Sequence, residues 1–289
     1  MISVRDKLIN VTGGMGSSIS YLTIGDDKTV LLDCGMAYCA KNLINNIKLA
    51  LPPDRRLNYV LLSHSHYDHI GAVPCIRKQW PEVRILGAEY ASHILQKPKA
   101  LKIIKDLASQ ASVYYGNGDI ADYDDSLLKV DQVVSDGFQI DLGGTAVTIL
   151  ETPGHTKCSL SFLINDEILY ASETTGVANK AGVIFPTFIS SLKQAETSLE
   201  KCKNVGAKHI IEAHNGFVKN TEGYWDRCME AIEWVKDFVN GLQAQGADED
   251  KIYNEFKGLA LDDSIKSIQP VFAFEINNRA MIRTIMHNK

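Results

Sequence analysis

Four potential metal ligands fall within six consecutive residues of this chain, in the segment His64-Ser-His-Tyr-Asp-His69. The segment directly follows the short apolar run 58–63, which is typical of a buried strand. Alternate side chains of a strand share a face, so His64 and His66 project together, and a turn after Ser63 lets Asp68 and His69 reach a second position. Imidazoles and a carboxylate packed together are costly unless they are paired or coordinated. The pattern therefore predicts a metal site rather than a His-rich surface loop.

Three further segments place possible ligands in loops that follow apolar runs. Each has small or turn-forming residues beside the candidate ligand. They are Thr152-Pro-Gly-His155, Ser172-Glu173-Thr174 and Glu212-Ala-His214-Asn-Gly216. The other histidines, His93, His209 and His287, have no such setting, and we interpret them as structural.

The predicted strands form two groups, and each group is followed by helices. The first group is 19–24, 29–33, 58–63 and 83–86, with helices at 70–79 and 89–115; otherwise the first third reads as strands and turns. The second group is 138–142, 146–150, 160–164, 167–170 and 209–211, with helices at 191–204 and from about 222 onward. Asn165-Asp166 is a hairpin turn signal. Two sheets packed face to face with helices outside satisfy this order.

Composition narrows the function classes. The 289 residues are 45% apolar and 22% charged, which is ordinary for a globular protein. The net charge is −5 and no long Lys/Arg run occurs, so nucleic acid is not an expected partner. No apolar run approaches the ~20 residues of a membrane span. Met1–Asp6 does not resemble a signal peptide, and six scattered cysteines are typical of reduced thiols, so we expect a cytoplasmic protein. Nothing in the sequence indicates the oligomeric state.

The order HxHxDH, PGH, an acidic residue and a final His before Gly resembles the metallo-β-lactamase superfamily over about residues 18–217. The segment Leu31-Leu-Asp-Cys-Gly35 resembles that family's early strand ending in a structural Asp. The resemblance implies an αββα sandwich with metals at one edge and helical additions at 89–115 and the C-terminus. We predict a catalytic domain at 1–221 and a helical extension at 222–289 that packs on it and caps the site.

The resemblance also implies the ligand sets. His64, His66 and His155 would hold one metal, Asp68, His69 and His214 would hold the second, and Glu173 would bridge them. Asp33 would orient one of these ligands. Most relatives have Asp where this chain has Glu173, and Glu is one methylene longer. Glu173 is therefore expected to bridge differently, to bind one metal only, or not to bind.

The implied activity is hydrolysis by a metal-bound hydroxide. The nitrogen-rich ligand set favours two Zn²⁺ ions, with Fe or Mn as alternatives. Two metals about 3.5–4 Å apart share a water and lower its pKa. Asp68 would be the catalytic residue that holds the hydroxide and passes a proton to the leaving group.

The helical additions point to a small-molecule substrate. They resemble those that cover the metal site in glyoxalase II-like and quinolone-signal-response-like thioesterases, which makes a thioester or related ester the first choice. Apolar residues of the tail either line an acyl pocket or simply pack the tail onto the sandwich. These residues are Phe256, Val271, Phe272, Phe274, Met281 and Ile285.

Other functions remain open. A phosphodiesterase or nuclease of the same fold is disfavoured by the acidic charge. A β-lactamase is disfavoured because no export signal is visible. A diiron redox protein usually has Glu at the position of His66 and carries a flavin domain. A non-catalytic metal-bearing sensor or partner-binding protein would explain the unusual Glu173, but the other ligand positions are intact.

Overall fold

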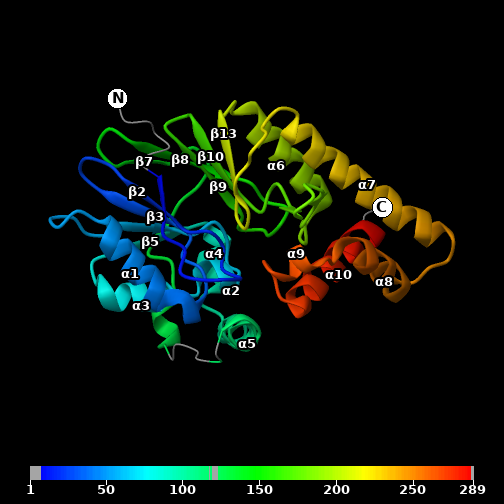
Figure 1. Cartoon of the computed structure of the whole chain (residues 1–289), viewed down its shortest axis with the longest axis horizontal. Helices are drawn as coiled ribbons and strands as arrows, with labels where there is room; N and C mark the ends of the chain where they lie inside the picture. Colours follow the sequence, from blue (N-terminus) through cyan, green and yellow to red (C-terminus); the bar gives the residue numbers. More distant parts are fainter. Residues whose placement is uncertain (1–7, 117, 119–122, 288–289) are drawn as a thin grey trace.

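Two six-stranded sheets lie face to face at the centre of the protein, with helices on both outer faces (Figure 1). The computed structural model describes residues 8–116, 118 and 123–287. The prediction made for Met1–Asp6 lies outside these residues. The arrangement confirms the predicted αββα sandwich.

The first sheet has the order β1-β2-β3-β4-β5-β6. Its strands are β1 (Leu8–Asn10), β2 (Tyr21–Ile24), β3 (Thr29–Leu32), β4 (Tyr59–Leu61), β5 (Arg84–Gly87) and β6 (Gln132–Val133). β3 and β4 are parallel neighbours, so their carboxyl ends meet at the same edge. This places Asp33 beside the start of the histidine segment at His64.

The second sheet has the order β14-β13-β10-β9-β8-β7. Its strands are β7 (Gln139–Asp141), β8 (Ala146–Glu151), β9 (Leu160–Ile164), β10 (Ile168–Ser172), β13 (His209–Glu212) and β14 (Gly216–Phe217). The predicted hairpin joins β9 to β10, and Asn165 and Asp166 both have the positive φ that a type I′ turn requires. β10 and β13 are parallel, so Glu173 and His214 leave the sheet at one edge.

Strand alternation builds three apolar layers. Val30 and Leu32 of β3 face the second sheet, whereas Leu31 faces the helices outside the first sheet. In the same way Tyr170 of β10 faces the first sheet and Leu169 faces the outer helices. Both strands are therefore buried on both sides, as expected for strands in a four-layer sandwich.

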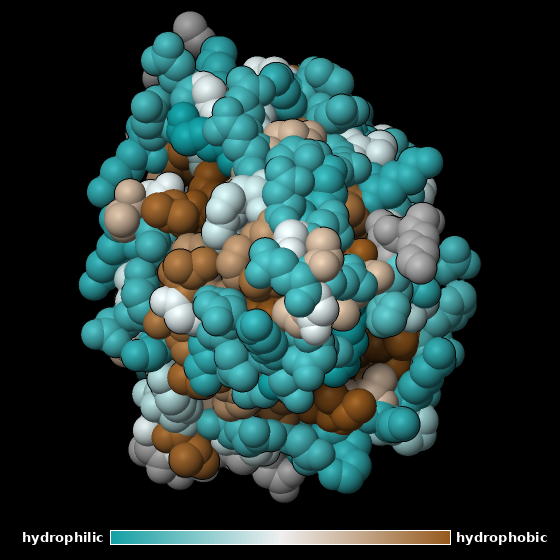
Figure 2. Space-filling model, turned by 90° about the vertical axis from the view of Figure 1, so that its right-hand side faces the viewer, coloured by the Kyte–Doolittle hydropathy of each residue, from teal (hydrophilic) through white to brown (hydrophobic). Residues whose placement is uncertain are grey.

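The helices divide between the two outer faces. Those near the first sheet are α1 (Ala40–Ala50), α2 (Tyr67–Ile70), α3 (Val73–Gln79), α4 (Glu89–Ile94) and α5 (Pro98–Tyr115), with short turns η2 (Ala37–Cys39) and η3 (Asp125–Leu127). Those near the second sheet are α6 (Leu192–Asn204), α7 (Tyr224–Ala244), α8 (Glu249–Ala260), α9 (Asp263–Lys266) and α10 (Val271–His287), beside the small hairpin of β11 (Val177–Ala178) and β12 (Ile184–Phe185). Figure 2 views the molecule from the side of the C-terminal helices, where hydrophobic side chains show between hydrophilic ones. Among the described helices, none is both long and apolar enough to cross a lipid bilayer.

Helix α1 was not predicted, because the first third of the sequence has mainly the pattern of strands and turns. Its buried face carries Leu43 and Ile47, which lie one turn apart. Three asparagines at positions 42, 45 and 46 have low helix propensity and obscure the helical pattern. Packing of Leu43 and Ile47 against the first sheet's apolar layer outweighs that propensity.

Candidate metal centre

The structure brings all seven predicted ligands together at one edge of the two sheets. The His64–His69 segment follows β4 in the first sheet, whereas His155, Glu173 and His214 follow β8, β10 and β13 in the second. The ligand atoms form two groups, each within 4.8 Å. The groups are His64, His66, His155 and Glu173, and Asp68, His69, His214 and Glu173.

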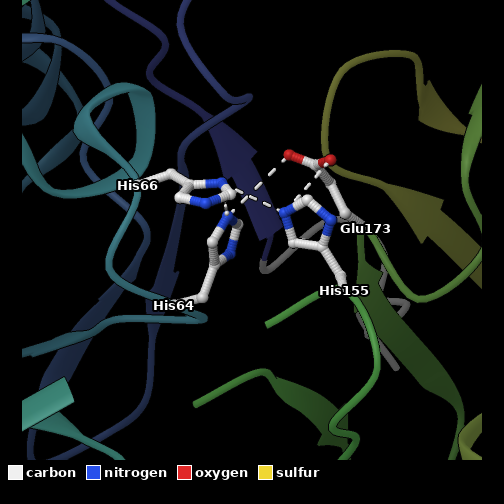
Figure 3. A group of neighbouring side chains, drawn as sticks. All are labelled: His64, His66, His155 and Glu173. Atoms are coloured by element: carbon white, nitrogen blue, oxygen red, sulfur yellow. Dashed lines mark hydrogen bonds and ion pairs between the residues drawn. The ribbon is translucent and has the colours of Figure 1, made fainter. Parts of the chain in front are cut away.

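The first group surrounds a common point (Figure 3). Nδ1 of His66 lies 3.1 Å from Nε2 of His64 and 3.1 Å from Nε2 of His155. Oε2 of Glu173 lies 3.5 Å from Nε2 of His155. Three nitrogens and a carboxylate oxygen thus face inward from four different directions.

The second group shares the same carboxylate. Oε1 of Glu173 lies 3.2 Å from Nε2 of His69 and 3.2 Å from Nε2 of His214. Oδ2 of Asp68 lies 3.7 and 3.6 Å from these two nitrogens. The two oxygens of Glu173 therefore face different groups, so the longer side chain still reaches the position between them.

Neighbouring oxygens fix the orientation of three imidazoles. Nδ1 of His155 lies 2.6 Å from the carbonyl oxygen of Thr187, and Nδ1 of His69 lies 2.7 Å from Oδ2 of Asp33. Nδ1 of His64 lies 3.1 Å from Oγ of Ser63, whose own hydrogen is donated to Asp33. These oxygens accept, so each Nδ1 carries the hydrogen, and in His64 and His155 Nε2 turns a lone pair to the centre. Against the effect of burial, Asp33 and Asp68 hold the pKa of His69 well above its usual value. Lone pairs that converge on a carboxylate fit a bound cation.

Asp33 is the centre of a buried network that joins the two sheets. Its carboxylate accepts hydrogen bonds from Ser63 N, Ser63 Oγ and the Tyr170 hydroxyl, all at 2.7 Å. The backbone of Asp33 has a φ of 52°, and that of Ser172 at the end of β10 has a φ of 54°. Strained backbone of this kind persists where surrounding contacts hold it, and often at functional sites.

The sequence pointed to Asp33 but not to its partners. Ser63 and Tyr170 carried no ligand signal, because a serine and a tyrosine at strand ends are common. Thr187 lies in a loop and acts through its main-chain oxygen, so its side chain gave no indication. His93, His209 and His287 lie outside both groups, and the six cysteines are all free thiols.

Electrostatics favour neutral imidazoles at His64 and His66. Burial, together with the nearby His155, lowers the pKa of His66 to about 3. Burial and the neighbouring His69 hold the pKa of His64 well below its usual value. Burial alone would raise the pKa of Glu173, but His155 and the contacts with His214 and His69 hold that pKa well below its usual range. Neutral imidazoles around an ionised carboxylate are the donor set that a divalent cation requires.

A cavity of about 240 Å³ opens beside the two groups. Its floor includes His66, Asp68, Glu173 and His214, and its walls come from both helical additions. The apolar wall residues are Ile103, Ile104, Leu107, Val177, Ile189, Ile268, Pro270, Ala273 and Ile276. No Lys or Arg is found among the described residues that line it.

The acyl-pocket alternative is wrong for all six tail residues, because none of them lines the cavity. Phe256, Phe274, Met281 and Ile285 are buried in the apolar layer between the second sheet and its helices. Phe256 lies on α8, whereas the other three lie on α10, which turns a different face toward the cavity. That face carries Ala273, Ile276 and Asn277. Phe272 packs at the edge of the layer outside the first sheet, and Val271 does not line the cavity.

Replacing Gly154 with alanine is expected to lower the free energy of unfolding by about 2–3 kcal/mol. A Cβ there would lie 2.6 Å from the backbone N and Cα of Ala195, and the φ of +141° disfavours any side chain. Urea denaturation measures the change. Gly206→Ala is the matched control, because Gly206 also has a positive φ but nothing lies near its Cβ. Equal losses in the two variants would contradict a steric role for the close approach at Gly154.

Comparison with known proteins agrees with this geometry. A family model described as the metallo-beta-lactamase superfamily matches residues 12–214. The metallo-beta-lactamase fold-containing protein ST1585 of Sulfurisphaera tokodaii is 28% identical over 204 residues, which are 68% of this chain and 72% of that protein. A crystal structure of ST1585 matches with a TM-score of 0.64 at 21% identity, covering 96% of this chain and 98% of that one.

Two further relatives have named activities. The atrochrysone carboxyl ACP thioesterase of Aspergillus fumigatus is 24% identical over 224 residues, covering 75% of this chain and 58% of that protein. A coenzyme oxidase of Methanocaldococcus jannaschii is 28% identical over 255 residues, covering 78% of this chain and 54% of that protein. The chain thus spans little more than half the length of each, and they differ in the reaction that their names state.

Proposed function

We propose that this chain, which belongs to the metallo-beta-lactamase superfamily, is a metal-dependent hydrolase that cleaves a thioester or related ester of a small acyl compound. The observation that carries the proposal is the apolar cavity that opens on both groups of ligands. A cavity with such walls accepts an uncharged acyl chain and holds its carbonyl end beside the ligands.

The two groups are proposed to hold two divalent cations, with zinc favoured by the imidazole-rich donor set. One cation would be bound by His64, His66 and His155, and the other by Asp68, His69 and His214. Glu173 would bind both cations. When bound, such a pair supplies Lewis acidity and lowers the pKa of an attacking water. Asp33, Ser63 and Thr187 keep the imidazoles turned toward the ions through their Nδ1 atoms.

Asp68 is the proposed proton carrier. Its side chain is 14% exposed and lines the cavity, so an incoming substrate reaches it. Burial raises the pKa of Asp68, which makes its carboxylate a better base. Its Oδ2 would accept the proton of the attacking water and deliver it to the sulfur or oxygen of the leaving group.

The cavity wall argues against a phosphodiester substrate in this position. A phosphodiester carries a negative charge, and none of the described wall residues is cationic. The name of the Aspergillus fumigatus thioesterase is consistent with the thioester proposal. The name of the Methanocaldococcus jannaschii oxidase keeps a redox function as the second candidate. Iron in the purified protein, with no cleavage of any thioester, would favour that second candidate.

We expect the protein to cleave S-acyl N-acetylcysteamine thioesters. The value of kcat/KM should rise with acyl length until the cavity is filled, by about fourfold per methylene, since burying one CH₂ contributes about 0.8 kcal/mol. A thiol-release assay over a series from acetyl to octanoyl measures this, with bis(p-nitrophenyl) phosphate as the comparison substrate. Cleavage of the phosphodiester but of no thioester would overturn the proposal.

A further inference from the structure

A second cavity, of about 480 Å³, adjoins the first. Ile268 lines both cavities. In two segments of the chain, one residue lines the first cavity and the next residue lines the second. Val177 and His214 face the first cavity, whereas their chain neighbours Ala178 and Asn215 face the second. A wall one residue thick therefore separates the second cavity from the proposed metal centre, and the amide of Asn215 ties this wall by donating to the carbonyl of Ala178.

The lining of the second cavity is cationic, in contrast to the first. Lys180, Lys219 and Arg227 line it, and no described carboxylate lies within ion-pair distance of any of the three. Its single acidic lining residue is Glu212, which is 5% exposed and accepts a hydrogen bond from the Tyr224 hydroxyl. In a chain of net charge −5, three cationic side chains without an ion-pair partner among the described residues are a local reversal of charge around this cavity.

The N-terminal end of helix α7 adds to the positive charge around the second cavity. Tyr224, the first residue of α7, lines the same cavity, and the N-cap residue Gly223 offers no side-chain hydrogen bond to the helix end. A helix of 21 residues carries a partial positive charge at this end, where Tyr224 N donates to the carbonyl of Thr221. Cationic side chains beside such a helix end are a suitable environment for a phosphate.

We infer that the second cavity binds the phosphate of a phosphopantetheine-type thiol carrier, so that the substrate is an acyl thioester of such a carrier. The inference rests on the proposed function. The acyl chain would occupy the apolar cavity, the thioester carbonyl would lie at the ligands, and the carrier would extend over Ile268 to Lys180 and Lys219. In the reaction the C–S bond breaks, a C–O bond to water forms, and the water's proton passes to the thiolate, giving a carboxylic acid and a free thiol. Free coenzyme A and an acylated carrier protein both present this phosphate.

The test compares one acyl group on coenzyme A, on 4′-phosphopantetheine, on pantetheine and on N-acetylcysteamine. The two phosphorylated thioesters should exceed the two others in kcat/KM by at least about tenfold, because hydrogen bonds to charged groups are stronger than those between neutral groups. The variant Lys180→Met/Lys219→Met should lose this preference and keep the rate on the N-acetylcysteamine ester. Arg227 is left unchanged, because its guanidinium donates to the carbonyls of Glu222 and Asn220 and holds the loop before α7.

The matched control is Lys41→Met/Lys48→Met, which makes the same charge change on the exposed face of α1. It should retain the preference for phosphorylated carriers. Binding of S-methyl coenzyme A, which has no free thiol, gives a readout without turnover, and its dissociation constant should rise at least about tenfold in the Lys180/Lys219 variant only. An unchanged preference and unchanged binding in that variant would overturn the inference.

Two other outcomes are distinct from that one. Failure of the wild type to cleave any thioester would contradict the proposed function, and the binding experiment would still test the cavity. A preference for the coenzyme A ester over the phosphopantetheine ester would assign the cations to the nucleotide phosphates, and would overturn the placement of the carrier's phosphate in the second cavity.

Discussion

Replacing His66 with alanine is expected to reduce kcat/KM for thioester cleavage by on the order of a thousandfold, since a metal supplies several kcal/mol of charge stabilisation. Nδ1 of His66 lies 3.1 Å from the Nε2 atoms of both His64 and His155, so its loss leaves the first group with two imidazoles and Glu173. The metal content should fall from about two ions per chain toward one, because the second group does not include His66. Elemental analysis and the thiol-release assay measure the two effects on the same preparation.

His93→Ala is the matched control, since His93 is exposed on α4 and lies in neither group. It should match the wild type in both metal content and rate. Equal rates for wild type and His66→Ala would remove catalysis from this centre. A reduced rate with an unchanged ion count would contradict the role of His66 as a ligand. The effect on the rate would then be assigned to the place of His66 in the lining of the substrate cavity.

Removal of the metals is expected to lower the melting temperature by about 10 °C. A ligand present at a thousand times its dissociation constant stabilises the folded state by about 4 kcal/mol, and each kcal/mol shifts the midpoint by about 2–4 °C in a domain of this size. The physical reason is that only the folded chain gathers the ligand atoms of each group within 4.8 Å of one another, so the cations bind the folded state preferentially. Without a cation, the buried Glu173 carboxylate is left with the imidazoles of His69 and His214, at 3.2 Å, as its nearest partners.

Differential scanning calorimetry with and without a strong chelator measures the shift, and added zinc should restore the original midpoint. The His66→Ala variant should show a smaller shift, because it begins with one ion fewer. A midpoint that stays constant after the metal is shown to be gone would mean that the two groups are stable without cations.

The sequence predicted the two sheets because their strands carry strong local signals. The apolar run before His64 and the Asn165-Asp166 turn are recognisable without tertiary context. Short edge strands such as β1, β6 and β14 were not predicted, because two or three residues show no periodicity. Helix α1 was missed for a different reason, since its asparagines mask a pattern that only packing of Leu43 and Ile47 enforces.

The ligands of the candidate site were predicted better than its cavity. Each ligand ends an apolar run, and the carboxyl ends of parallel strands meet at one edge, so their convergence follows from the topology. The direction in which a helix turns its faces does not follow from such rules. Phe274 and Ile276 are both apolar residues of α10, yet one is in the core and the other lines the cavity. That choice depends on how α10 docks against α7 and α8, which the sequence pattern does not contain.

Each group of ligands draws on both sheets: His64 and His66 come from one, and His155 and Glu173 come from the other. An ion bound in either group would therefore link the two sheets of the sandwich. The metal affinity would then depend on how closely the two sheets pack. A change that weakens this packing, such as loss of the contact between the Tyr21 and Tyr170 rings across the sheets, would lower the metal affinity although every ligand remained in place. Either sheet with its helices would carry only some of the ligands of each group. Neither half of the sandwich could therefore form the metal centre alone.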